Sequence, residues 1–353
     1  MVSRERFARM FEHKEADRIP IIDSPWTTTI ERWQREGMPK DVDWVDFFDI
    51  DHVSNVGADI SPRYERKILE DTAEYRIETT SWGATVKNFK HTTSTPEFID
   101  FMVKTPDDWK QAKLRMTPSR DRINWEHLNQ NYSKWKERGD WIIGGLWFGF
   151  DVTHSHFVGT ERLLTALMTD PDWCVDMFNH FLDMGIAHLE MLWAEGYTFD
   201  AVSWPDDLGY RNGTFFSLET YRELLKPVQK RAVEWAHAKG IKAHLHSCGN
   251  VSSLVPEFIE IGIDALNPLE VKAGMDTVKL KKEYGDLLVL HGGINAVLWD
   301  DLQAIEEEMR AKLPILKEGG GYIFSSDHSI PSSVSLEGFK HIVSLAKSLG
   351  SYV

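Results

Sequence analysis

The feature of this sequence that most constrains its fold is a regular alternation of short apolar segments with longer amphipathic ones from residue 140 onward. The short segments have the length of buried strands and several end near glycine. The longer segments carry helical spacing, and one opens with Asp170-Pro171-Asp172, an N-cap followed by proline in the first turn. The predicted strands are 141–146, 199–204, 241–246, 264–268, 287–291 and 322–325.

Two further predicted strands, residues 19–23 and a weaker segment near Val53, bring the total to eight. Strands that alternate with helices form a parallel sheet, and eight such units form a (β/α)8 barrel. Residues 62–91 interrupt this rhythm with three β-like segments, 66–69, 75–80 and 84–89, which are separated by turns. The sequence therefore predicts an α/β fold, a single TIM barrel over residues 1–353 with a small antiparallel β insertion at about 62–91.

Composition excludes several classes of protein. The formal net charge of −15 argues against a nucleic-acid binder, which would carry a basic stripe. No run approaches eighteen apolar residues, so we expect no membrane span, and the charged N-terminus lacks the apolar stretch of a signal peptide. Two cysteines, Cys174 and Cys248, are too few for a disulfide framework. We therefore expect a cytoplasmic protein with reduced thiols.

The densest chemical signal is the segment His244-Leu245-His246-Ser247-Cys248-Gly249-Asn250, at the predicted end of a strand. His246 and Cys248 are two residues apart, so on extended backbone they point to the same side. In an α/β barrel the carboxyl ends of the strands are where chemistry takes place. An imidazole and a thiol on one side of a strand end are half of a zinc site, although they would also suit a plain buried pair.

Other polar and aromatic residues fall at the ends of the remaining predicted strands. Each also has a structural interpretation: the neighbouring aspartates suit loop caps, Glu270 a solvated acid, and His328 a hydrogen-bonded turn. His154 and His156 share a side only if their segment is extended. The tryptophans suit core packing or the wall of a pocket for a flat ligand. The candidates are Asp23, Trp26, Trp147, His154, Trp204, Asp206, Asp207, Asn267, Glu270, His291, Asp327 and His328.

The sequence resembles the uroporphyrinogen decarboxylase superfamily, which includes methyltransferases of corrinoid-dependent methyl transfer. The resemblance covers nearly the whole chain, and the order and spacing of its motifs make it specific. It implies a (β/α)8 barrel, in agreement with the strand count. The matching segments are Ser3-Arg4-Glu5-Arg6-Phe7, Ala16-Asp17-Arg18-Ile19-Pro20, Asp206-Asp207-Leu208-Gly209, Leu225-Lys226-Pro227, His246-Ser247-Cys248-Gly249-Asn250-Val251, Asp264-Ala265-Leu266-Asn267-Pro268-Leu269-Glu270, Gly292-Gly293-Ile294, Gly319-Gly320-Gly321-Tyr322-Ile323 and His328-Ser329-Ile330-Pro331.

Two departures from the family pattern indicate the branch. Decarboxylases of uroporphyrinogen carry an arginine pair after the first strand, whereas this chain reads Asp23-Ser24-Pro25-Trp26-Thr27-Thr28. A polycarboxylate would find no bidentate partner there. The thiol-methylating members hold zinc with His-x-Cys and a second cysteine near the eighth strand, where this chain has Asp327-His328. A harder ligand set suits an oxygen, such as that of a methoxy group.

The resemblance and its departures imply a corrinoid-dependent methyltransferase that carries out O-demethylation. It would move a methyl group from a methoxylated, aromatic small molecule to the Co(I) corrinoid of a partner protein, because no cobalamin-binding domain is recognisable in the chain. Self-association into a homodimer is left open. Two rivals are a metal-free lyase of the decarboxylase type acting on a small carboxylated substrate, and a non-catalytic barrel within a methyl-transfer complex.

In this interpretation the site residues have three roles. Zinc would be bound by His246 and Cys248 with Glu270 or His328. Asp23, Asp206, Asp207 or His328 would position the substrate or protonate the leaving oxygen. Substrate contacts would come from Trp26, Trp147, Trp204, His154 and Asn267.

Overall fold

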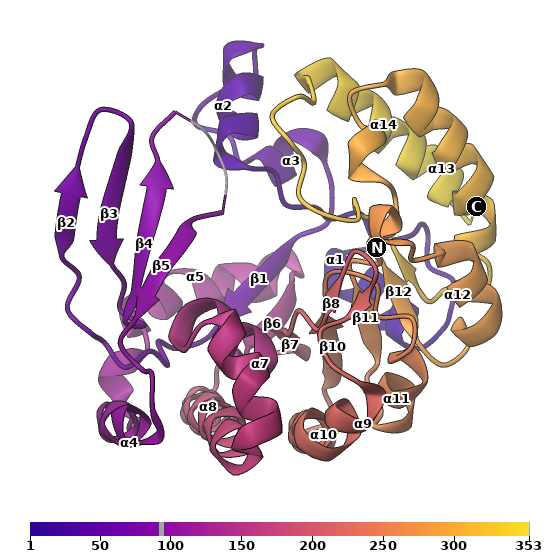
Figure 1. Ribbon diagram of the computed structural model, residues 1–353. Helices are drawn as coiled ribbons and strands as arrows, with labels where there is room; N and C mark the ends of the chain where they lie inside the picture. The colour runs from indigo at the N-terminus through magenta and orange to yellow at the C-terminus, as the bar shows by residue number, and fades with distance from the viewer. Residues whose placement is uncertain (92–94, 353) are drawn as a thin grey trace.

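A curled parallel sheet forms the centre of the computed structural model, which describes residues 1–91 and 95–352 (Figure 1). Its strand order is β1-β6-β7-β10-β11-β12-β13, and every neighbouring pair is parallel. The strands are β1 (Val53–Val56), β6 (Trp141–Gly145), β7 (Ala201–Pro205), β10 (Lys242–His246), β11 (Ala265–Asn267), β12 (Val289–His291) and β13 (Tyr322–Ile323).

The first predicted strand, residues 19–23, takes the eighth position between β13 and β1. Ile21 forms a parallel bridge with Phe324 on one side, and its carbonyl accepts the Asp51 N–H at 2.9 Å on the other. The segment does not extend into a full strand because Pro20 has no N–H, and the Asp51 carboxylate takes the Ile21 N–H at 2.8 Å. The predicted TIM-barrel class is confirmed, with this strand reduced to a single bridge.

Helices surround the sheet on its outer side (Figure 1). Asp170 caps α8, as predicted. The helix predicted over 217–239 is instead interrupted by the π turn η3, because Pro227 has no N–H to donate to the Glu223 carbonyl. The helices are α1 (Ser3–Phe11), α2 (Thr27–Arg35), α3 (Trp44–Phe48), α4 (Pro106–Arg115), η1 (Arg120–Arg122), α5 (Trp125–Arg138), α6 (Phe150–Val152), η2 (Thr153–Phe157), α7 (Thr160–Thr169), α8 (Pro171–Ala194), α9 (Leu218–Thr220), η3 (Tyr221–Leu225), α10 (Lys226–Ala238), α11 (Val255–Glu260), η4 (Val271–Ala273), α12 (Thr277–Tyr284), η5 (Ala296–Leu298), α13 (Leu302–Leu316) and α14 (Leu336–Gly350). None of the described helices is long and apolar enough to cross a membrane.

A four-stranded antiparallel sheet stands beside the barrel, in purple at the left of Figure 1. It consists of β2 (Ile68–Asp71), β3 (Tyr75–Thr79), β4 (Ala84–Phe89) and β5 (Glu97–Phe101). The three predicted segments correspond to β2, β3 and β4, whereas β5 lies beyond the predicted limit of residue 91. A hairpin turn of this sheet carries Trp82, whose ring packs edge-on against Trp147 of the barrel at 5.4 Å between centroids. The two-residue pair β8 (Gly209–Tyr210) and β9 (Gly213–Thr214) follows β7.

Helix α1 closes the amino end of the barrel. Phe7 and Phe11 stack on Trp141, at the start of β6, with centroids 5.5 and 5.2 Å apart. All three side chains are buried. Because this end is filled by aromatic packing, the carboxyl ends of the strands are left as the open face. The division of the chain into one domain stays a prediction.

Candidate functional site

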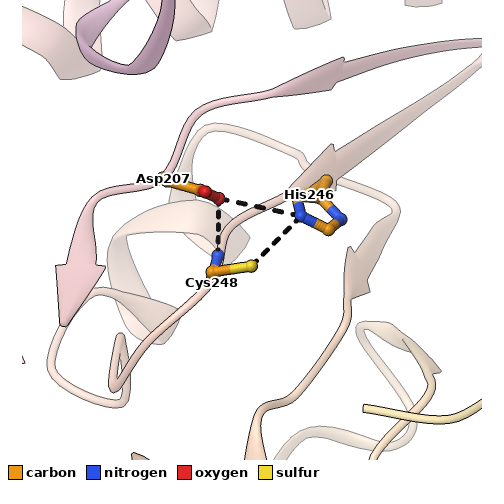
Figure 2. A group of neighbouring side chains, drawn as sticks. All are labelled: Asp207, His246 and Cys248. Atoms are coloured by element: carbon orange, nitrogen blue, oxygen red, sulfur yellow. Dashed lines mark hydrogen bonds and ion pairs between the residues drawn. The ribbon is translucent and has the colours of Figure 1, made fainter. Parts of the chain in front are cut away.

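His246, Cys248 and Asp207 converge at the carboxyl end of the sheet (Figure 2). His246 ends β10, where it pairs with Asn267 and Pro205 of the neighbouring strands. The Cys248 Sγ lies 3.3 Å from the His246 Nε2, and the Asp207 Oδ1 lies 3.7 Å from the same nitrogen. One donor atom from each residue lies within 4.8 Å of the others, so a single cation could contact all three.

The loop after β10 is shaped by tight backbone packing. Gly249 has φ +80°, and a Cβ at this position would lie 2.2 Å from the Gly209 carbonyl carbon. Only glycine combines this conformation with so close an approach. The Cys248 N–H donates to the Asp207 Oδ1 at 2.8 Å, and the Gly249 N–H donates to the Glu270 Oε2 at 2.7 Å. Both carboxylates therefore help to fix the loop that carries the thiol.

Asn267 fixes the orientation of the His246 ring. The Asn267 Nδ2 faces the His291 carbonyl at 3.3 Å, and a carbonyl can only accept, so the amide oxygen faces His246. The His246 Nδ1 lies 2.5 Å from this oxygen and must donate its proton to it. The lone pair of Nε2 is then directed toward the thiol. Ligating histidines are oriented by neighbours in this way.

The surroundings of Cys248 favour a bound cation. Burial raises the pKa of the thiol well above its usual range, and the negative charges of Asp207 and Glu270 raise it further. The thiol is therefore neutral in the protein alone, and a metal would supply the positive charge that stabilises the thiolate. An imidazole nitrogen, a sulfur and a carboxylate oxygen form a donor set that fits zinc and leaves a coordination position open.

These residues open onto a cavity of about 520 Å³ at the ends of β10, β11 and β12. No lysine or arginine is among its described lining residues. Of the residues predicted from sequence, it is lined by Asp23, Asp207, His246, Cys248, Asn267, His291 and His328.

Asp23 enters this cavity from the segment that bridges β13. Its carboxylate accepts the Ser326 N–H at 2.7 Å and the Ser326 hydroxyl at 2.8 Å. Burial raises the pKa of Asp23 to about 7 and the nearby Asp327 carboxylate acts in the same direction, although the hydrogen bonds oppose both effects. Asp23 is therefore suited to exchange a proton near neutral pH.

Glu270 and His328, the predicted additional metal ligands, lie outside the converging group, and Asp207 takes that place. Glu270 is occupied by the Gly249 N–H and by Lys272 at 3.2 Å. The His328 side chain is exposed at the cavity rim. Asp327 does not hold His328, because its carboxylate accepts the backbone N–H groups of Val271 and Ala296 at 2.8 and 2.7 Å.

Asp206 is fully buried and does not line the cavity, contrary to its predicted contact with substrate. Its Oδ1 accepts the Asp151 N–H at 2.9 Å and its Oδ2 accepts the Gln229 amide at 2.8 Å. Burial raises the pKa of Asp206 to about 8. Gly149, with φ +93°, has no room for a Cβ, which would lie 2.5 Å from Asp206 Oδ2. Asp206 therefore supports the turn after β6.

The tryptophans and His154 that were predicted to contact the substrate do not gather around the 520 Å³ cavity. Trp204 is fully buried beside Phe148, so it does not form a pocket wall. Trp26 precedes α2 and lines neither the 520 Å³ cavity nor the neighbouring cavity that contains Trp147. His154 lies in the π turn η2 and stacks on Phe150, with centroids 4.5 Å apart.

Asp151 is an acid near the site that the sequence analysis missed. Its Oδ2 accepts the Trp147 indole N–H at 2.8 Å. Burial raises the pKa of Asp151, and the negative charge of Asp207 raises it further. Its only sequence signal was its place in the loop after a predicted strand end, between Phe150 and Val152.

The comparisons with known proteins agree with this architecture. Residues 137–349, more than half of the chain, match the family described as uroporphyrinogen decarboxylase (URO-D). The chain is 30% identical over 149 residues to a uroporphyrinogen decarboxylase of Helicobacter pylori (strain P12), a match that covers 40% of this chain and only 39% of that protein. A solved methyltransferase from Methanosarcina mazei has a similar fold, with a TM-score of 0.67 and 15% identity over 99% of both chains. The chain belongs to the uroporphyrinogen decarboxylase family.

Proposed function

We propose that this protein transfers a methyl group from a methoxylated small molecule to the Co(I) corrinoid of a partner protein, with zinc bound by Asp207, His246 and Cys248. The observation that carries the proposal is the convergence of these three donor atoms within 4.8 Å at the carboxyl end of the barrel. The fold shared with a methyltransferase is compatible with it.

The charge of the cavity also supports this proposal over decarboxylation of a polycarboxylate. The described lining contains the acids Asp23 and Asp207 and no lysine or arginine. A substrate with several carboxylates would meet repulsion there and no bidentate partner. A neutral methoxy compound meets neither obstacle.

Each residue has a defined task in the proposed reaction. Asp207, His246 and Cys248 would hold the zinc, which would supply Lewis acidity toward the ether oxygen of the substrate. Asn267 keeps the Nε2 of His246 directed toward the ligand group. As the C–O bond breaks, its electron pair stays on oxygen, and the Co(I) acceptor supplies the pair for the new bond to the methyl carbon. Asp23 in its protonated form donates a proton to the leaving oxygen.

The test combines metal analysis with a transfer assay. Protein purified without added metal should contain about one zinc per chain, and it should methylate free cob(I)alamin with a methoxyaromatic donor. Cys248→Ala should lose the zinc and at least about tenfold in rate, equal to roughly 1.4 kcal/mol of barrier. Cys174→Ala is the matched control, because Cys174 is buried within α8. Release of carbon dioxide from a carboxylated substrate, with no cob(I)alamin methylation by any methoxy donor, would support the lyase instead.

A further inference from the structure

A second cavity, of about 770 Å³, lies beside the first at the ends of β1, β6 and β7. Trp82 reaches it from the hairpin turn of the antiparallel sheet, and Trp147 reaches it from the loop after β6. The two rings pack edge-on with centroids 5.4 Å apart. The antiparallel insertion therefore supplies one wall of a cavity that the barrel alone would leave open.

The charged and titratable groups in this wall are occupied by the protein itself. Arg122 donates to the carbonyls of Asp59, Ser61, Arg115 and Thr117. The His188 ring is satisfied by the Met184 carbonyl and the Ser119 N–H. These side chains hold the backbone around the cavity.

Asp59 completes this set, because it accepts from Arg63 at 2.8 Å and from the Ser61 N–H at 2.9 Å. Among the described lining residues, Arg122 is the one lysine or arginine and Asp59 the one acid, so the lining carries no net charge. The guanidinium of Arg122 is directed to backbone carbonyls.

Two asparagines line this cavity, and the Oδ1 of Asn124 accepts the His127 N–H at 3.1 Å. Asn55 is the one whose whole amide group remains for a ligand. It lies on β1, its side chain is exposed, and no described residue forms a hydrogen bond with its amide. It lines the cavity together with Val56 of the same strand. An apolar, aromatic wall with few amide groups matches a flat ligand that carries one or two neutral oxygens.

The second cavity adjoins the proposed metal ligands. Pro205, at the end of β7, lines it, and Asp207 lies two residues further along the same loop. Asp151, in the segment after β6, accepts the Trp147 indole N–H at 2.8 Å and lies close enough to Asp207 for their negative charges to interact. A ring packed against this pair of tryptophans would thus lie near the loop that carries Asp207.

We propose that this cavity binds the neutral aromatic ring of the methyl donor, that Trp82 of the insertion determines specificity for it, and that Asn55 bonds to a ring oxygen. This inference rests on the proposed function, because it places the donor of that reaction. In this proposal the cavity does not bind methyl donors that carry a carboxylate on the ring.

Isothermal titration with two probes tests the inference without any turnover. The neutral 1,2-dimethoxybenzene should bind at least about tenfold more tightly than 3,4-dimethoxybenzoate. Trp82→Ala should weaken the neutral probe at least about tenfold. Phe89→Ala, an aromatic truncation on exposed β4 surface of the same sheet, should leave its affinity unchanged.

A charge variant keeps the test decisive if Trp82→Ala fails to fold. Asn55→Lys places a cation in the cavity and should raise affinity for the benzoate at least about tenfold. Equal binding of both probes to the wild type, or unchanged binding in both folded Trp82→Ala and Asn55→Lys, would overturn the cavity assignment. Tight, variant-sensitive binding of the neutral probe with no methyl transfer to cob(I)alamin would instead overturn the proposed function and leave this assignment standing.

Discussion

The amide oxygen of Asn267 lies 2.5 Å from the Nδ1 of His246, and the amide nitrogen of the same residue faces the His291 carbonyl. This pair determines which nitrogen of His246 carries the proton. The relationship crosses neighbouring strands, because His246 of β10 and Asn267 of β11 are paired in register. The sheet itself therefore presents the Nε2 lone pair to Cys248 and Asp207.

Replacing Asn267 by Ala should weaken zinc binding about 10–100-fold, the usual loss when a ligand's orienting partner is removed. The His246 ring would then be free to rotate and to carry its proton on either nitrogen. Competition with a chromophoric chelator measures the affinity. Asn131→Ala, a half-buried asparagine of α5 whose amide bonds to the His127 carbonyl, is the control and should bind zinc like the wild type. Equal affinities of both variants would show that Asn267 does not orient a ligand.

Asp207, not Glu270, should be the carboxylate that holds the metal. Asp207 belongs to the converging group, whereas Glu270 is occupied by Gly249 and Lys272. Asp207→Ala should reduce bound zinc strongly, while Glu270→Gln should retain it, because a glutamine oxygen can still accept the Gly249 N–H. Elemental analysis after gel filtration distinguishes the two variants.

His328 provides a second comparison in the same measurement. Its side chain lies at the rim of the cavity and outside the converging group. His328→Ala should therefore keep its zinc and lose at least about tenfold in methyl transfer, or roughly 1.4 kcal/mol of barrier, if the ring contacts the substrate. Loss of zinc in this variant would show that His328 is a metal ligand after all.

The sequence pattern was sufficient to predict the barrel and the part of the site that lies within one short segment, His246 and Cys248. Strand–helix alternation located β6, β7 and β10 to β13, because each buried strand is a short apolar run. Spacing alone placed His246 beside Cys248, since alternate residues of a strand share a face. The π turn at Tyr221–Leu225 and the strand Glu97–Phe101 were missed. The first depends on one missing N–H and the second on pairing with β4, and neither changes local periodicity.

The non-local half of the site could not be predicted from spacing. Asp206 and Asp207 are adjacent in sequence, yet one is buried under the Gly149 turn and the other faces the cavity. The difference arises from the strand's alternation and from which loop packs on each side. Trp204 likewise lies at the end of a predicted strand, which suggested a pocket wall, but it packs against Phe148. These outcomes depend on tertiary contacts that one sequence does not display.

Asp23 should make stability depend on pH. Burial raises its pKa in the folded protein to about 7, above the roughly 3.9 of an unfolded Asp. Between these values the folded state binds more protons than the unfolded state, so stability falls as pH rises from about 4 to about 7. Asp23→Asn lacks this contribution. We compare the melting temperature of wild type minus that of Asp23→Asn at two pH values, and this difference should be smaller at pH 8 than at pH 5. The same difference at both pH values would contradict the assignment.

Asp206 should prove to be a structural residue whose loss destabilises the fold without removing the metal. Its carboxyl group accepts two buried donors, the Asp151 N–H and the Gln229 amide, and Gln229 in turn accepts the Tyr221 hydroxyl at 2.8 Å. Truncation to Ala leaves both donors without a partner, at about 1–3 kcal/mol each. Urea unfolding should therefore show Asp206→Ala less stable than wild type by about 2–6 kcal/mol, the sum of those two penalties.

The isosteric variant Asp206→Asn separates the structural role from a chemical one. It retains an oxygen for the Asp151 N–H, and Gln229 can turn its own amide to accept from the new Nδ2, because the Tyr221 hydroxyl accepts as well as donates. Most of the lost stability should therefore return, and zinc content should equal that of wild type in both variants once folded. A folded Asp206→Asn protein that had lost its zinc would show that Asp206 reaches the ligand group, in conflict with its place beneath the Gly149 turn.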